Sequence, residues 1–443
     1  MRNTRSSAPP AARFLPSPRT TIPPILFAPS AASILIASAT VAVIATAAIA
    51  TKTKTTDKPA KKCAHVRGRT FENQRSEMNN TDTTLNISST HKTVSRRHEI
   101  TVCSVLLCFC VLFIHAASLF ISSADKSSFV YLPVAALWRM CGCAAQGFVF
   151  IAGMRYMISA GKNKKSVPAY YLSRIIRIVP LYVLWCAIYY AYDVLVEKAK
   201  FDLGFFLKCL VTGDLTGHLY YIPVLLQLTL IAPLSLLLRK KLPASLILPA
   251  SLLITSIFGD HLTDILNAVF PAAPAFNYSD RVFTSFLIFW SAGCCAGAAY
   301  DKFCKLLDEA KVFIICAFFV SAALDLGAMY YSFILGRFIW CIKQIQTLYV
   351  LCAILFLMTV SRMIVKNRPE APVLFQKGEL GGYFIFVSHI LPLEAVQLLL
   401  NKLGVGVAVG LGVRVLVLAL WFFLCSLAYG NRLYMLHAKR KFR

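Results

Sequence analysis

The run Val102–Ile121, VCSVLLCFCVLFIHAASLFI, decides the fold class. Its twenty residues carry no Asp, Glu, Lys or Arg, and an α-helix needs this length to cross a bilayer core of roughly 30 Å. Similar runs recur along the 443-residue chain, which is 58% hydrophobic with a mean hydropathy of +0.65. Charged residues make up 15%, against about a quarter in a soluble domain. The sequence therefore predicts an all-α, polytopic bundle of membrane helices.

Residues 99–430 are expected to form a membrane domain of ten spans. The approximate ranges are 101–122, 143–160, 177–196, 217–238, 244–259, 281–300, 311–332, 343–364, 380–400 and 404–428. Two shorter apolar segments, Val130–Cys141 and Leu203–Gly213, precede the second and fourth spans. The pairs Gly293-x-x-x-Gly297 and Gly406-x-x-x-Gly410 have the spacing that allows helices to pack closely.

The distribution of charge argues for a membrane and against nucleic acid as the partner. The net charge is +26, but the basic residues lie between the apolar runs and no nucleic-acid-binding motif accompanies them. They concentrate in alternate loops, for example residues 162–165, 239–241 and 431–443. The positive-inside rule then predicts that both ends of the ten-span unit are cytoplasmic.

The two ends of the chain differ from the membrane domain. Residues 1–98 are rich in Ser, Thr, Ala, Pro and basic residues and are expected to be disordered. The apolar segment Ala31–Ala50 within them is either signal-like or an extra helix. Alternatively, this upstream sequence is not translated and Met78 is the start. Residues 431–443 are expected to form a basic cytoplasmic tail.

Two histidines lie alone in apolar runs, His115 in the first span and His389 in LGGYFIFVSHILPLEAVQLLL (residues 380–400). An ionisable side chain in hydrocarbon is costly, so it usually faces the protein interior and marks function. At 1.5 Å per residue, His115 lies about 21 Å and His389 about 14 Å from the inner ends of their spans. Tilted helices would bring them to one cavity, and Pro392 should loosen the helix beside His389. A structural role, bonded to a neighbouring helix, is the alternative for each.

Other polar residues are predicted at membrane depth. They are Arg139, Arg155, Gln227, Asp325, Lys343, Gln344, Gln346 and Arg414. For Arg155 we expect snorkelling to the interface, whereas Asp325, Lys343 and Arg414 are candidates for internal pairs. The fifteen cysteines lack zinc-ligand spacing and are interpreted as small buried residues, so no metal site is predicted.

Two further segments admit two interpretations each. In GHLYYIPVLLQLTLIAPL (residues 217–234), His218, Tyr220 and Tyr221 suit an aromatic belt at the outer interface, with substrate contact as the alternative. In YYLSRIIRIVP (residues 170–180), Arg174 and Arg177 share one helical face. They either anchor the span or bind the phosphates of a cytoplasmic anionic cofactor.

Six segments in order resemble the acyltransferase-three family of bacterial integral-membrane acyltransferases, over residues 99–430. They are CVLFIHAAS, WRMCGCAAQGFVFIAGM, YYLSRIIRIVPLYVLW, GHLYYIPVLLQLTLIAPL, SAGCCAGAAY and GELGGYFIFVSHILPLE. Three positions depart from the pattern. Many members carry Arg or Lys eleven residues before the first-span histidine, where this chain has Ser104; Ala152 replaces a serine, and Tyr220–Tyr221 replace Trp-Phe.

The resemblance implies an enzyme of the bacterial plasma membrane. It would move an acyl group, usually acetyl from cytoplasmic acetyl-CoA, to a hydroxyl of a cell-surface carbohydrate or lipid-linked sugar. His115 would be catalytic as base or acyl carrier, and His389 would match a later family histidine. Arg139 would match a second-span arginine and, with Tyr220 and Tyr221, contact the substrate, while the two cofactor-side arginines would be Arg174 and Arg177. The alternatives are a transporter or flippase, and a catalytically inactive member of the family.

Overall fold

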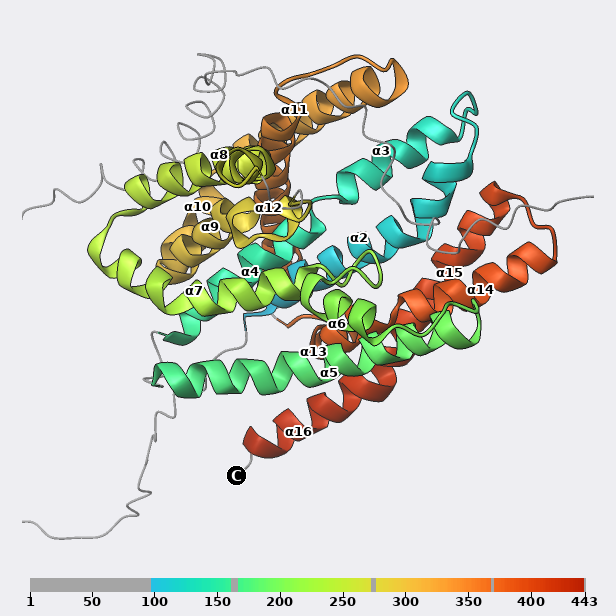
Figure 1. Ribbon diagram of the computed structural model, residues 1–443. Helices are drawn as coiled ribbons and strands as arrows, with labels where there is room; N and C mark the ends of the chain where they lie inside the picture. The colour runs from blue at the N-terminus through green and yellow to red at the C-terminus, as the bar shows by residue number, and fades with distance from the viewer. Residues whose placement is uncertain (1–96, 161–165, 272–275, 368–369, 442–443) are drawn as a thin grey trace, which may run out of the picture.

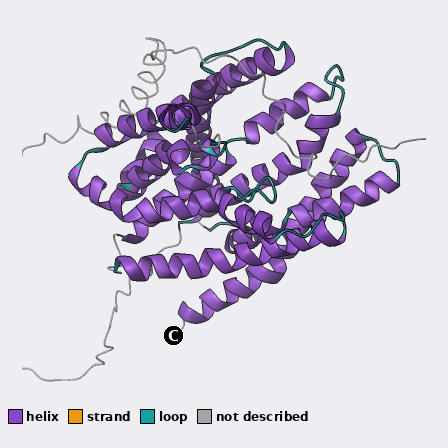
Figure 2. Cartoon of the chain, viewed as in Figure 1, coloured by secondary structure: helices purple, strands orange, loops and turns teal. Residues whose placement is uncertain are grey.

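The computed structural model describes residues 97–160, 166–271, 276–367 and 370–441 (Figure 1). This part of the chain consists of helices joined by loops and contains no strand (Figure 2). Residues 1–96 of the predicted disordered region lie outside the described residues, and these include the segment Ala31–Ala50 and Met78.

The described helices follow one another as the hydropathy pattern predicts. They are α2 (His98–Ser123), α3 (Tyr131–Cys141), α4 (Ala144–Ala160), α5 (Val167–Leu195), α6 (Leu203–Thr212), α7 (Tyr221–Lys241), α8 (Ala244–Val269), α9 (Leu287–Ala298), α10 (Tyr300–Glu309), α11 (Lys311–Met329), α12 (Ile342–Asn367), α13 (Val373–Ser388), α14 (Ile390–Lys402), α15 (Val407–Cys425) and α16 (Asn431–Lys441). Short 3-10 turns, η2 (Ser279–Arg281) and η3 (Phe283–Phe286), precede α9, and π-helical turns follow α11 (Tyr330–Ile334) and α15 (Ser426–Gly430).

The protein is a multi-pass membrane protein by the length and composition of its helices. Among the described residues, seven helices can cross a membrane, or ten if each of three bent helix pairs counts as one span. The larger number equals the predicted ten spans. The two short apolar segments form α3 and α6, so the prediction of an all-helical membrane bundle is confirmed.

Helix α2 occupies the centre of the bundle (Figure 1). It packs against α3, α4, α12, α13 and α15. Buried residues lie on every side of it, among them Val102, Leu107 and Ala116, as expected of a helix that is apolar all round. The central position brings residues of α2 near several other helices.

The two glycine pairs have different environments. Gly293 and Gly297 let α9 lie directly on α4, because a Cβ on either would clash with the backbone of Phe150 or Met154. On the facing helix, a Cβ at Gly153 would come within 2.6 Å of the Trp290 carbonyl oxygen. In contrast, Gly406 precedes the first residue of α15 and has no neighbour within 4 Å of a Cβ position. The prediction of close packing is confirmed for the first pair and wrong for the second.

The helix pair α13 and α14 breaks at His389. Helix α13 ends at Ser388, α14 begins at Ile390, and the two are bent by 54°. Pro392 has no N–H to offer the carbonyl of Ser388, which explains why the helix breaks here. The predicted loosening beside His389 is confirmed, and it turns this histidine to the interior, where it is 0% exposed.

Candidate active site

Three histidines from distant parts of the chain form one cluster. The ring centroid of His115 lies 4.9 Å from that of His389 and 5.8 Å from that of His218. His218 and His389 are 4.7 Å apart. We call these three residues the histidine cluster. It joins α2, the loop before α7, and the junction of α13 and α14.

Sequence reasoning missed the place of His218. The aromatic-belt interpretation puts this residue at the membrane interface, but its side chain is 2% exposed and contacts the other two rings. That interpretation is wrong because the loop between α6 and α7 folds back into the bundle. The alternative of substrate contact, together with the resemblance of GHLYYIP to a family segment, was the signal that could have located it.

The ring nitrogens of the cluster are available for proton transfer. His389 donates from Nδ1 to the Phe386 carbonyl oxygen at 2.7 Å, so its neutral ring carries the lone pair on Nε2. In His218, Nδ1 lies 3.1 Å from the hydroxyl oxygen of Thr216. The Nε2 atoms of both are buried and have no hydrogen-bond partner in the described part of the chain. Unpartnered ring nitrogens beside a third histidine can accept and pass on a proton.

The three rings do not form a metal site. Within the described ranges, no group of three or more His, Cys, Asp or Glu side chains is arranged to hold a metal ion.

Hydrogen bonds hold the residues next to two cluster members. Arg414 of α15 donates from Nε to the Ala116 carbonyl oxygen at 2.9 Å, next to His115, and from Nη1 to Gln397 at 2.8 Å. Trp421 donates to the Ser388 hydroxyl at 2.9 Å, next to His389. Arg414, a candidate for an internal ion pair, therefore bonds neutral acceptors on α2 and α14.

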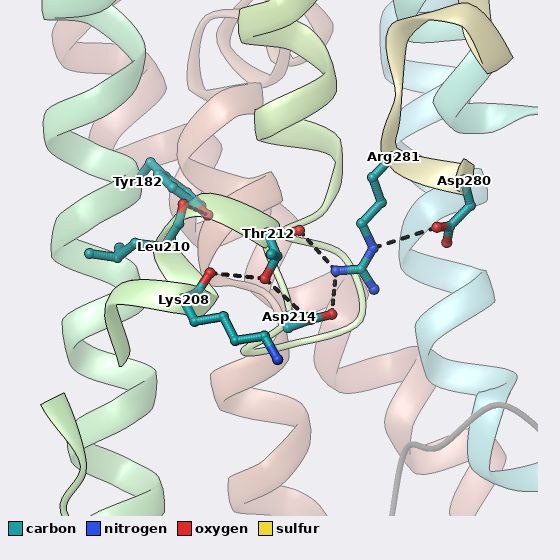
Figure 3. Close-up of polar contacts among 7 residues, drawn as sticks. All are labelled: Tyr182, Lys208, Leu210, Thr212, Asp214, Asp280 and Arg281. Carbon is teal, nitrogen blue, oxygen red and sulfur yellow. Dashed lines mark hydrogen bonds and ion pairs between the residues drawn. The ribbon is translucent and has the colours of Figure 1, made fainter. Parts of the chain in front are cut away.

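A polar clasp holds the loop that carries His218 (Figure 3). Arg281 of η2 donates from Nη1 to the Thr212 carbonyl oxygen at 2.8 Å and forms an ion pair with Asp214. Between those two residues the chain turns at Gly213, whose φ of 72° favours glycine. Gln227 of α7 donates to the Arg281 carbonyl oxygen at 2.9 Å and so fixes the other side of the clasp.

A cavity of about 300 Å³ lies between α2, α4, α5, α7 and α13. Arg155, Arg174 and Arg177 line one part of it, which we call the basic end, together with Tyr156, Tyr170 and Trp290. Apolar side chains such as Leu112, Phe148 and Ile385 line the remainder.

The cavity extends from the basic end to Phe386, which contacts the histidine cluster, but none of the three histidines lines it. Ser104, which bonds Arg155, and Leu112 both line it and are eight residues apart on α2, or about 12 Å. Phe386, another lining residue, has its ring 5.4 Å from that of His218 and 6.2 Å from that of His389. A ligand in the cavity can therefore contact the arginines and reach Phe386, which packs on the rings of His218 and His389.

The predicted site residues divide into the clustered histidines, the residues that line the cavity, and the residues that lie away from it. His115 and His389 come together, and Tyr221 lines the cavity beside Phe386, with ring centroids 5.5 Å apart. Arg174 and Arg177 line the basic end, where Arg174 lies 5.6 Å from the Tyr170 ring centroid.

Arg139 and Tyr220 do not line this cavity. Arg139 instead binds Asp325 of α11 through Nε and Nη2, each at 2.8 Å. The Asp325 side chain is 2% exposed, so this is a buried bidentate pair that joins α3 to α11. Asp325 therefore forms an internal ion pair, and its partner is Arg139, the residue predicted to contact the substrate.

Arg155 differs from its prediction. Its Nη2 donates to the Ser104 hydroxyl at 3.1 Å and forms an ion pair with Glu379 of α13. The guanidinium therefore has protein partners at the cavity that the snorkelling interpretation did not include.

Fold and site together place three cavity-lining arginines and a cluster of three histidines inside one bundle of membrane helices. A comparison with protein-family models identifies the family of the chain. The model described as an acyltransferase domain matches residues 97–430, so the chain belongs to the acyltransferase 3 family and is an acyltransferase. No curated protein and no solved structure matched the chain in the other two comparisons.

Proposed function

We propose that this protein transfers an acetyl group from coenzyme A to a hydroxyl of a cell-surface or lipid-linked carbohydrate. One observation carries the proposal: a single cavity connects three arginines with Phe386, which packs on two rings of the histidine cluster. An acyl donor with phosphates at one end and a thioester at the other matches that arrangement.

The basic end suits the nucleotide part of coenzyme A. Guanidinium groups bind phosphate oxygens with strong, charge-assisted hydrogen bonds. Tyr156, Tyr170 and Trp290 offer ring faces beside the arginines, with the Tyr156 ring centroid 5.2 Å from that of Tyr170 and 6.1 Å from that of Trp290. Aromatic faces of this kind stack on a purine base. The apolar remainder of the cavity suits the pantetheine arm.

The histidine cluster suits the transfer step. A sugar hydroxyl is a poor nucleophile until a base within hydrogen-bond reach removes its proton. We assign this role to His115, which accepts the proton while the hydroxyl oxygen attacks the thioester carbonyl carbon. The C–S bond then breaks, and the protonated imidazole returns the proton to the coenzyme A thiolate. The Tyr221 hydroxyl is a candidate donor to the intermediate oxyanion.

The flanking histidines support this base. The ring centroids of His389 and His218 lie 4.9 Å and 5.8 Å from that of His115. A neutral neighbour ring can orient the base or relay its proton to the acceptor side. We assign them positioning and relay roles.

The loop charges support an orientation for the reaction. The basic loops favour a bacterial plasma membrane protein with both ends of the ten-span unit in the cytoplasm. Arg174 follows the basic stretch 162–165 in the chain, so the basic end of the cavity would open to cytoplasmic coenzyme A. The histidine cluster would then receive the acceptor from the opposite face.

The test is the ester content of surface glycan in cells that produce His115→Ala or wild-type protein. We expect the variant to lose at least about 100-fold of the acetylation rate, the contribution typical of a general base, while the protein still reaches the membrane. His261→Ala is the matched control, because His261 lies on α8, is 66% exposed and pairs with the exposed Asp264. Full acetylation by the His115 variant would exclude the assigned base.

A further inference from the structure

We infer that Arg155 is a third donor-binding residue of the cavity, which binds a phosphate of the acyl donor and is positioned by Glu379. The inference rests on the proposed function and extends it to residues that the predicted cofactor site, Arg174 and Arg177, did not include.

Arg155 is a charged residue in a largely apolar helix. It is the one charged residue in α4, AAQGFVFIAGMRYMISA, where a charge costs a few kcal/mol or more in hydrocarbon. Its neighbours Met154 and Tyr156 are 0% and 6% exposed, but the Arg155 side chain is 42% exposed. Arg155 also lines the cavity.

The hydrogen bonds of Arg155 leave donors free. Its bonds to Ser104 and to Glu379 both use Nη2. The guanidinium has five N–H donors on three nitrogens. Nε and Nη1 bond no residue in the described part of the chain, so their N–H groups remain for a ligand at the basic end.

Glu379 fixes the direction of these donors. Its carboxylate accepts a hydrogen bond of 2.6 Å from the Thr101 hydroxyl on α2 and pairs with Arg155 on α4. The Glu379 side chain also lines the cavity but is only 14% exposed. Three arginines against this one glutamate still leave the cavity lining positive, which favours an anion.

The competing explanation is a purely structural ion pair between α4 and α13. The two explanations differ in what the pair does to the phosphates of the donor. A structural pair would affect every donor equally, whereas a phosphate-binding arginine affects only donors that carry phosphate.

The experiment compares acetyl-CoA with acetyl-pantetheine, which has no phosphate, on Arg155→Leu protein in vesicles. We expect the KM for acetyl-CoA to rise about tenfold, because a charge-assisted bond is lost, and kcat to stay unchanged. Kinetics with acetyl-pantetheine should equal those of the wild type. Arg155→Lys should recover part of the loss, and Arg432→Leu, an exposed arginine of α16, should change nothing.

A relocated charge provides a second arm. The Ser104 hydroxyl lies 3.1 Å from Arg155 Nη2, so an arginine at position 104 would bring its charge to the same corner from α2. Ser104→Arg combined with Arg155→Leu should restore the acetyl-CoA KM to within a few-fold of wild type. Equal effects on both donors, or none on either, would overturn the inference.

Direct binding of coenzyme A separates this inference from the proposed function. A wild type that binds coenzyme A but transfers no acetyl group would refute the proposed function, while weaker binding by Arg155→Leu would still support the inference. Equal coenzyme A affinity of wild type and Arg155→Leu would refute the inference even if transfer proceeds.

Discussion

The histidine cluster and the basic end of the cavity are built in opposite ways. The cluster is enclosed, uses neutral hydrogen bonds such as that of His389 to Phe386, and leaves two buried nitrogens unpartnered. The basic end is charged and partly open, with Arg155 held by Glu379. Ser104 lines the basic end, and Leu112, about 12 Å further along α2, lines the apolar part of the cavity. Because bond making and donor binding are assigned to separate residues, variants of the histidine cluster should lower kcat, and variants of the basic end should raise the KM for acetyl-CoA.

Replacement of the flanking histidines should have the largest effect after that of His115. His389→Asn and His218→Asn remove a ring nitrogen but keep a polar side chain of similar size. We expect kcat to fall about 100-fold in each, with the KM for acetyl-CoA unchanged, because both lie beyond the basic end. Steady-state kinetics in vesicles measure this. A change confined to KM would break the division between the two regions.

Replacement of the predicted cofactor arginines should have the opposite signature. Arg174→Leu and Arg177→Leu each remove a charge that lines the basic end. The KM for acetyl-CoA should rise about tenfold with kcat kept, since each charge-assisted phosphate contact is worth about 1.5 kcal/mol or more. A loss of kcat at saturating donor would instead mean that these arginines act on the chemical step.

Loosening of the polar clasp should have the smallest effect. Arg281→Ala removes the bond to the Thr212 carbonyl oxygen and the pair with Asp214, which hold the loop before His218. Because the His218 imidazole is kept and only its loop is held less firmly, we expect kcat to fall only a few-fold, with a stability loss of about 1 kcal/mol. Lys208→Ala is the control, since only its backbone carbonyl takes part in the bonds shown in Figure 3. A kcat equal to that of wild type would show that the clasp does not position His218.

Much of the fold could be predicted because span length is a local property of the sequence. Runs such as Val102–Ile121 specify membrane helices by themselves, and Pro392 specifies the break at His389 through its missing N–H. The failure at Gly406 is also local: the spacing was correct, but the residue precedes α15 and faces no other helix.

The site was only partly predictable because its contacts join distant residues. His115 and His389 were identified by their cost in hydrocarbon, but His218 lies in a loop, and no local pattern says that a loop folds inward. Arg139 and Asp325 are 186 residues apart in the sequence, and Arg155 and Glu379 are 224 apart. The sequence marked Ser104 as a position without the basic residue of many relatives, and only the structure puts the Arg155 guanidinium beside it.

The most direct test measures coenzyme A binding and acetyl transfer on one preparation of His115→Ala protein in vesicles. We expect the dissociation constant for coenzyme A to equal that of the wild type, because the basic end is intact. We expect the rate of labelled acetyl transfer to fall at least about 100-fold. Transfer at the wild-type rate would contradict the claim that the histidine cluster carries the chemistry.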